Sequence, residues 1–512
     1  MNDLFELISS LSKSEKRYFK LHNSLFTIGE ENNYIKLFDI IEKQKDYNEH
    51  KILEQFKGKR LINNFSAAKN HLYNMILRSL NVFHQDISTQ LRNNLNLVKV
   101  LSNKGLNKQA EILLLKSKKI AHKYEIYPIL LDLLNWETGL IMRQGPLGIS
   151  SSHYDNIIKE SYDIVDRIKN LNEFRSVYLR FYYKSYKKGL IRNKIDLIEY
   201  KELFNKALFL SEDNAESYEA KVYYYTVYAY YYFLQHDYIH ANSYMKKLVE
   251  LNENNPHFTE RNKSLQIWTL VNFFLCQLNL KKYKEMYSTL SKLKLLKMKS
   301  ETGKQELFLA QIRLELIYYL ELGKFQEGVE LVKTIEIQLN SLIVKTNTIH
   351  NDILNNITLI AHMYFGVKDY SKCIHYLNKI INNADQDLNA NEVCFSKIMS
   401  LIVFYEKGDK IFLTYAIKST YRFLLSRKYL YKVEKTILDF IQSKAIKSNS
   451  KKEIIDAFIA IKEEFVELSK DPFEKNFFRY MDFVSWIESK IENRSYGEIL
   501  REKAKAVLRK GE

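Results

Sequence analysis

Apolar residues follow helix-start signals near the beginning of the sequence. Ser12 and Glu15 have the spacing of a capping box, in which each side chain binds the backbone amide of the other residue. Leu11 before this box, and Tyr18 and Phe19 after it, supply an apolar stripe at helical spacing. The pattern predicts a helix that starts directly after Ser12.

Three more helical segments are predicted at 34–43, 49–56 and 64–84. The second is separated from the third by Gly58 and the basic residues around it. Three compact helices with a long third member are compatible with a helix-turn-helix.

From about residue 90 the pattern repeats. A turn that holds an aromatic residue or a glycine is followed, a few residues later, by a position that is usually small. In four units these positions are 42 to 45 residues apart: Ala241, Met286, Gly328 and Cys373. Such periodicity indicates a solenoid of antiparallel helix pairs, in which the small residue lets two helix backbones approach closely.

One of these units resembles a tetratricopeptide repeat. Ala229 and Tyr232 match the small and aromatic positions of that family's first helix, and Asp237, Tyr238 and Ala241 match its turn and the following alanine. A second unit matches through Ala361, Tyr364, Asp369, Tyr370 and Cys373, and a third matches in part through Tyr319, Phe325 and Gly328. The unit around Lys282 departs from the family, with Phe274 and Met286 at small-residue positions. The resemblance extends over roughly residues 91–390.

The resemblance implies an all-α fold, namely a right-handed α-α superhelical solenoid of antiparallel helix pairs with degenerate repeats. We expect an N-terminal helical domain at 1–90, either a helix-turn-helix or a cap, then the solenoid at 91–410 and a C-terminal helical region and cap at 411–512. The composition agrees, because 14 Gly and 4 Pro in 512 residues leave little turn chemistry for β-rich folds.

Tetratricopeptide proteins bind peptides on a concave surface lined by the first helix of each repeat. The corresponding positions in this chain are Thr226, Tyr230, Phe233, Arg313, Ile317, Thr358 and His362. They lack the Lys and Asn pattern with which some family members clamp a terminal carboxylate, so a partner of that kind is not expected. The run of tyrosines at 223–232 is expected to be buried on several sides, with a groove role open for some of them.

The charge raises a second hypothesis. The net charge is +17 and the isoelectric point is near 9.2, although only 17 of the 78 basic residues are Arg. Residues 51–124 contain 14 Lys and Arg against 3 acids, and residues 410–452 contain 11 against 2. Such an excess suits nucleic-acid phosphates, but lysine is also the common solubilising cation.

In a DNA-binding regulator, the third predicted helix would read the bases and its neighbours would contact phosphates. The base-reading candidates are Ser66, Lys69, Asn70 and Tyr73, and the phosphate-contacting candidates are Lys57, Lys59, Arg60 and Arg78.

Signatures of catalysis are missing from the sequence. It has no phosphate-binding loop, dinucleotide fingerprint, nucleophile elbow, zincin motif or paired-cysteine motif. His236 and His240 have the spacing of paired metal ligands, but they fall across a predicted turn and lack the zincin glutamate. We expect no enzyme activity, cofactor, metal or membrane partner, and a cytoplasmic location.

The favoured function is therefore a non-enzymatic scaffold that binds a protein or peptide through its concave face. A DNA-binding regulator whose solenoid acts as a sensor is the main alternative. RNA binding by a basic solenoid surface and an unrecognised enzyme are the remaining ones.

Overall fold

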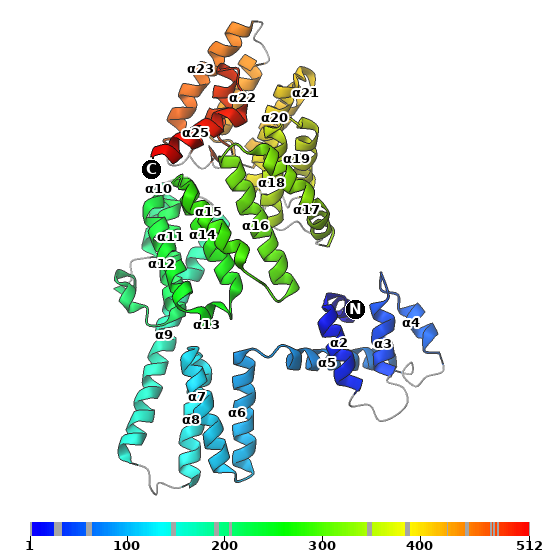
Figure 1. The fold of residues 1–512 in the computed structure, drawn as a ribbon, viewed down its shortest axis with the longest axis vertical. Helices are drawn as coiled ribbons and strands as arrows, with labels where there is room; N and C mark the ends of the chain where they lie inside the picture. The colour runs from blue at the N-terminus through cyan, green and yellow to red at the C-terminus, as the bar shows by residue number, and fades with distance from the viewer. Residues whose placement is uncertain are drawn as a thin grey trace. The chain divides into compact units, whose positions relative to one another are not determined.

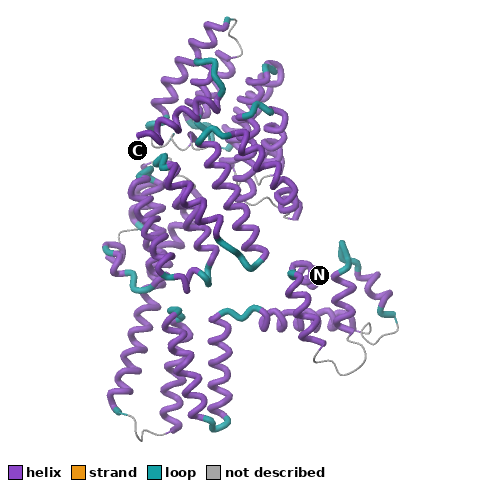
Figure 2. Tube along the Cα trace, viewed as in Figure 1, coloured by secondary structure: helices purple, strands orange, loops and turns teal. Residues whose placement is uncertain are grey.

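The computed structural model describes the following residues: 3–24, 33–57, 64–144, 150–188, 194–203, 207–345, 351–383, 390–427, 429–445, 450–471, 474, 477–478 and 481–510. Across these residues the fold is all-α, with 25 α-helices and no β-strand (Figure 1, Figure 2). The predicted all-α class is confirmed. The chain forms two compact units, Met1–Ile168 and Lys169–Glu512, which are described separately.

Unit 1 starts with five helices: α1 (Asp3–Ser10), α2 (Lys13–Ser24), α3 (Asn33–Glu42), α4 (Glu49–Gln55) and α5 (Phe65–Phe83). The capping box is present, because the Ser12 amide donates to Glu15 Oε2 at 2.6 Å and the Glu15 amide donates to Ser12 Oγ at 3.3 Å. Phe19 stacks on Phe38 in the core of these helices. The three helices predicted after residue 30 match α3, α4 and α5 to within one residue at each end.

The rest of unit 1 contains α6 (Ile87–Asn103), α7 (Asn107–Lys123), α8 (Tyr127–Gln144) and the first part of α9 (Ser151–Lys188). Their shared core includes Leu91, Leu114 and Ile164. The ammonium group of Lys118 lies 2.8 Å from both Glu137 and Glu160, and so connects α7 with α8 and α9.

Unit 2 is built mainly from consecutive helix pairs. The pairs are α11 (Tyr218–Leu234) with α12 (Tyr238–Asn254), α14 (Lys263–Asn279) with α15 (Tyr283–Leu295), α16 (Glu301–Glu321) with α17 (Phe325–Lys345), α18 (Asn351–Gly366) with α19 (Tyr370–Asn383), and α20 (Ala390–Lys407) with α21 (Lys410–Ser426). Shorter elements precede or interrupt them: α10 (Lys194–Glu202), η2 (Ala207–Leu210), η3 (Glu212–Asn214) and α13 (Pro256–Thr259). Neighbouring pairs stack, with α14 on α16 and α16 on α18, as in an α-solenoid.

All five pairs turn in the same way. The residue at the turn has a positive φ, namely His236 (63°), Lys281 (55°), Gly323 (63°), Lys368 (64°) and Gly408 (73°). The amide after it donates to a carbonyl five residues earlier, at 3.0 Å in the Asp237–Tyr232 case and 2.9 Å in the Asp369–Tyr364 case. This bond is the closing feature of a Schellman motif. The turns predicted from the sequence pattern are confirmed, and Gly408 adds one beyond residue 390.

Close packing after the turn explains the small residues. A side-chain carbon on Gly328 would overlap Met363 Sδ and lie 2.9 Å from Met363 Cγ, so α17 approaches α18 closely at this point. Cys373 is fully buried at the equivalent place in the next pair. Met286 and Phe274, which depart from the family pattern, are fully buried as well.

The C-terminal part of unit 2 contains α22 (Lys432–Phe440), the π-helical turn η4 (Ile441–Ala445), α23 (Lys451–Leu468), α24 (Phe483–Ile491) and α25 (Tyr496–Lys510). The last helix packs against α16, in the middle of the array. Arg501 Nη1 donates to the carbonyl of Gly323 at 2.9 Å, and Tyr496 stacks on Phe325. The tail therefore contacts the α16–α17 pair directly.

Candidate functional site

Aromatic side chains of α9 and of the first helices of two helix pairs gather in unit 2. Tyr178 and Tyr182 of α9, Tyr230 of α11 and Trp268 of α14 belong to this group, with Arg313 of α16 beside them. We call these five residues the aromatic surface. Tyr230 stacks on Trp268 with ring centroids 5.8 Å apart, and Tyr178 stacks on Tyr182 at 6.2 Å. Four helices that are distant in sequence thus contribute to one cluster.

Burial controls the protonation of the central tyrosine. It raises the pKa of Tyr230 to about 12, and the neighbouring Tyr178 acts in the same direction. The Arg313 guanidinium and a hydrogen bond with Trp268 oppose this rise in pKa. Tyr230 is therefore a neutral phenol near pH 7, with a hydroxyl able to donate or accept a hydrogen bond.

Charged groups border the aromatic surface. Arg175 Nη2 lies 3.2 Å from Glu219 Oε1, and the Tyr223 hydroxyl donates to the same carboxylate at 2.8 Å. Tyr223 contacts Tyr178 with ring centroids 5.1 Å apart. Aromatic groups at the centre and charged groups at the edge are the usual arrangement of a protein-binding patch.

The structure brings together two of the predicted groove residues, Tyr230 and Arg313. Phe233 is half-buried and packs edge-on against Tyr238. The other four side chains are buried between helices: Thr226, Ile317, Thr358 and His362. Thr358 and His362 bond within their own helix, Thr358 to the Leu354 carbonyl and His362 Nδ1 to the Thr358 carbonyl, both at 3.0 Å. In this conformation these four positions present no side-chain surface to a ligand.

Three members of the aromatic surface were absent from the predicted set: Tyr178, Tyr182 and Trp268. The first two lie on the long helix α9, in a region where the repeat pattern is weak. Their spacing of four residues, which places two aromatic rings on one helix face, was the available signal. Trp268 lies in the unit that departs from the family pattern.

The remaining tyrosines of the 223–232 run mostly pack inside the first pair. Tyr224 and Tyr225 are buried, as the run predicted. Tyr228 stacks on Tyr244 of α12 with ring centroids 4.9 Å apart. These rings join α11 to α12 on the side opposite the aromatic surface.

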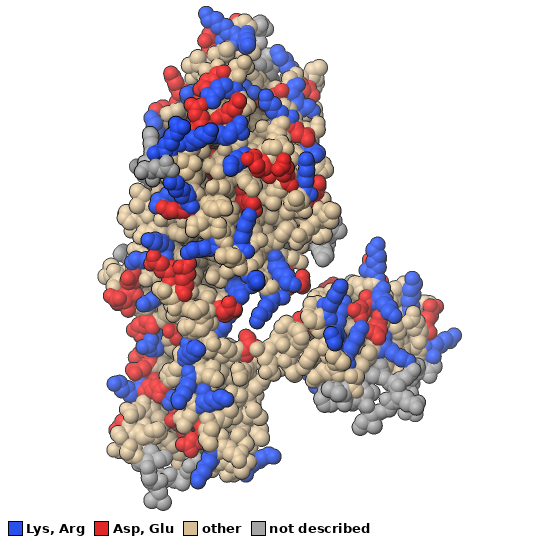
Figure 3. All heavy atoms as spheres, in the orientation of Figure 1, with Lys and Arg blue, Asp and Glu red and all other residues tan. Residues whose placement is uncertain are grey.

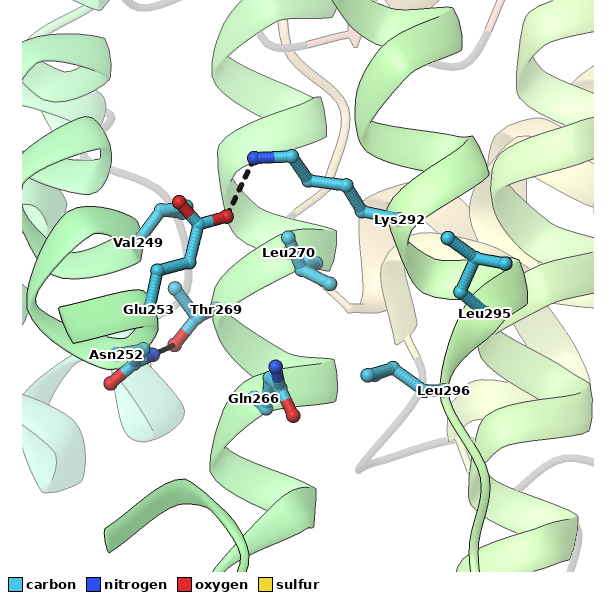
Figure 4. Close-up of a pocket in the computed structure, with 9 residues that line it drawn as sticks. All are labelled: Val249, Asn252, Glu253, Gln266, Thr269, Leu270, Lys292, Leu295 and Leu296. Atoms are coloured by element: carbon cyan, nitrogen blue, oxygen red, sulfur yellow. Dashed lines mark hydrogen bonds and ion pairs between the residues drawn. The ribbon is translucent and has the colours of Figure 1, made fainter. Parts of the chain in front are cut away.

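A small pocket lies between α12, α14 and α15 (Figure 4). The Lys292 ammonium is 2.6 Å from Glu253 Oε1, and Asn252 Nδ2 donates to Thr269 Oγ1 at 3.2 Å. The volume is about 180 Å³, below the roughly 300–1,000 Å³ of small-molecule sites. Four of its polar side chains already bind each other in pairs, so this pocket is a weak candidate for a ligand site.

The described residues contain no cluster of three or more side chains suited to a metal ion. His240 Nδ1 pairs with Asp237 at 2.7 Å, and His236 Nδ1 lies 2.8 Å from the Tyr238 hydroxyl, so both histidines have local partners.

Burial raises the pKa of the Cys276 and Cys394 thiols to about 12, and raises that of Cys373 strongly. All three thiols are therefore protonated and poorly nucleophilic near pH 7.

The residues proposed for DNA contact have mixed surroundings. Lys57, Ser66, Asn70 and Arg78 are exposed, whereas Tyr73 is half-buried against the helical core. Lys69 pairs with Glu49 at 2.7 Å and lies over the Phe65 ring, which reduces its availability to a base. Lys59 and Arg60 lie outside the described residues.

Charge of both signs is interspersed over the face of the molecule that Figure 3 shows. Among the described helices, none is both long and apolar enough to cross a membrane.

The chain matches no protein-family model, no curated protein and no solved structure.

Proposed function

We propose that this chain is a non-enzymatic interaction scaffold with tetratricopeptide-like repeats, which binds a protein or peptide through the aromatic surface. The observation that carries the proposal is the convergence of Tyr178, Tyr230, Trp268 and Arg313 from four separate helices. Tyr, Trp and Arg are the residue types that contribute most to binding energy at protein interfaces. Tyrosine also offers a large contact area with little loss of side-chain entropy.

The chemistry of the surface suggests features of the partner. A neutral Tyr230 can hydrogen-bond to a peptide backbone, and the aromatic rings can pack against apolar or proline side chains. The Arg313 side chain is 25% exposed, and its guanidinium can bind a ligand carboxylate through two parallel hydrogen bonds. The proposal places the scaffold in the cytoplasm, and its three buried, unpaired thiols suit a reducing compartment.

A peptide-library selection on the full chain tests the proposal. Binding of the selected peptides is measured by fluorescence anisotropy for the wild type, for Trp268→Ala and for Arg313→Glu. We expect each variant to bind at least about tenfold more weakly, since each removes a central contact. A third variant, Tyr182→Ala, removes a tyrosine that is 56% exposed on the proposed surface, and its matched control is Tyr287→Ala, at a tyrosine that is 59% exposed on α15. Peptides that bind all variants equally well would refute the proposed surface.

One observation favours the DNA-binding alternative. Ser66, Asn70, Asn74 and Arg78 recur every four residues along α5, and all four are exposed. Polar side chains at this spacing form a continuous stripe along one helix face. Duplex-DNA binding that falls steeply between 50 and 300 mM salt, and is lost in Arg78→Glu with Asn70→Asp, would support this function.

A further inference from the structure

An exposed apolar stripe with cationic ends runs along α7 in unit 1. Ile112 is 70% exposed and Leu115 is 43% exposed. Lys108 and Lys119 are exposed on the same helix face, one on each side of this apolar pair. Neither lysine forms an ion pair within the described part of the chain. The buried residues Ala110, Leu114 and Ala121 lie on the opposite face of the helix.

A second exposed stripe runs along the first part of α9, also in unit 1, and its ends are acidic. Ile158 is 56% exposed and Tyr162 is 71% exposed. Asp155 and Asp166 are exposed at the two ends of this apolar pair, and neither is ion-paired within the described residues. Ile157 and Ile164 lie on the buried face of this helix.

The two stripes match in length and oppose each other in charge. Lys108 and Lys119 are eleven residues apart, and so are Asp155 and Asp166. Eleven residues span about 16 Å, or about three helical turns, so each stripe places two like charges on one face with an apolar pair between them. On α9 the exposed Lys159 lies on the same face, four residues after Asp155. The whole of α7 has five lysines and one acid, whereas residues 151–168 have four acids and two cations.

These stripes are not used for contact between α7 and α9 of the same chain. That contact runs through Glu160, which binds Lys118 at 2.8 Å and His122 at 2.6 Å. Lys118 lies on the side of α7, whereas His122, three residues after Lys119, borders the face that carries Lys108 and Lys119. The apolar residues of both stripes remain exposed beside this contact, so both stripes are exposed at the same time.

We propose that the lysine stripe of α7 binds the aspartate stripe of α9 on a second copy of this chain. In such a contact Ile112 and Leu115 pack against Ile158 and Tyr162. The lysines at the two ends meet the aspartates in either relative direction of the helices, because the spacings are equal. Apolar burial supplies most of the affinity, and the charges select the register and speed the encounter.

A nucleic acid is a poorer occupant of the α7 stripe. Phosphates would contact the lysines, but Ile112 and Leu115 between them would have no apolar partner. A nucleic acid also leaves the acidic stripe of α9 unused. A second copy satisfies both stripes, and since the two surfaces differ, the contact is of the heterologous type.

Charge reversal in the full chain tests the proposal, with the molar mass measured by light scattering during size-exclusion chromatography. We expect the wild type to self-associate at about 100 µM, a concentration at which even a weak contact is populated. Lys108→Glu with Lys119→Glu, and separately Asp155→Lys with Asp166→Lys, should each weaken association at least about tenfold. The variant carrying all four changes should regain association, because the charges are again complementary.

Controls separate a lost contact from a lost fold or a different occupant. Lys333→Glu, at an exposed position of α17, should leave association unchanged, and far-UV circular dichroism should show that every variant is folded. A wild type that stays monomeric at about 100 µM would overturn the proposal. So would a folded fourfold variant that stays dissociated, or loss of duplex-DNA binding in the lysine variant alone while the aspartate variant behaves as wild type.

Discussion

A single histidine shows how a predicted binding residue can instead belong to the core. His362 lies inside α18, where Nδ1 donates to the Thr358 carbonyl and the ring stacks on Phe395 with centroids 5.4 Å apart. Its Nε2 atom has no hydrogen-bond partner among the described residues. Burial lowers the pKa of this imidazole to about 4, against the opposing effect of the Thr358 hydrogen bond. His362 is therefore neutral at pH 7 and contributes packing.

This pKa predicts a stability that depends on pH. In the unfolded chain the histidine takes up a proton near pH 6.5, whereas in the folded chain it does so only near pH 4. The unfolded state thus binds more protons between these values, and stability falls as the pH drops through this window. The free energy of unfolding, measured in urea, should fall between pH 7 and pH 4.5, and we expect His362→Gln to reduce this fall by about 2–3 kcal/mol. His375→Gln, an exposed histidine on the next helix, is the control. Equal pH slopes in wild type and His362→Gln would contradict the prediction.

At the scale of the element, the repeated turn is the feature that sequence predicts best. Helix ends, turn residues and the following small or apolar position lie within a few residues of each other, so the local chain determines them. The boundaries of α3 to α5 and the turns at Gly323 and Lys368 were predictable for this reason. The turn at Lys368 even forms without glycine, since its φ of 64° is adopted by a lysine.

A lysine in the left-handed region gives a direct test of this turn geometry. Lys368→Gly should stabilise the protein by about 1 kcal/mol, because glycine adopts this conformation without the clash of a side-chain carbon. The same change at Lys333, an exposed position inside α17, should destabilise it by about 1 kcal/mol, since glycine is a poor helix former. Thermal and urea unfolding of the two variants measure both effects. Destabilisation by Lys368→Gly as well would contradict the prediction, because it would mean that glycine does not relieve strain at this turn.

Contacts between distant elements were not predictable from the repeat pattern. The pairing of Tyr230 with Trp268 and Arg313 depends on how α11, α14 and α16 pack, which no local motif encodes. Carrying family groove positions across also failed to identify the exposed residues, because four of those seven side chains pack between helices. The repeat lengths of 42 to 45 residues exceed the usual 34, so the helix faces need not keep the family's orientation.

At the scale of the whole unit, the last helix supports the middle of the array. Ala504 of α25 is buried in one core with Leu314 of α16 and Tyr283 of α15. Residues 504 and 314 are separated by nearly two hundred positions, so this contact closes a very long loop of chain. Repeat arrays usually depend on nearest-neighbour contacts, and a contact of this kind makes the central and terminal helices unfold together.

The prediction is that damage to α25 loosens α16 and not only the C-terminal end. Ala504→Glu places a charge in the shared core, and we expect it to destabilise unit 2 by about 2–4 kcal/mol because the carboxylate is buried without a partner. Hydrogen exchange should rise in α15 and α16 as well as in α25. Ala506→Glu makes the same change at an exposed position two residues later, so it should leave exchange unaltered. Exchange that rises only in α23 to α25 of the Ala504→Glu variant would mean that the tail is a separate cap, because central repeats that share a core with it cannot remain protected once that core opens.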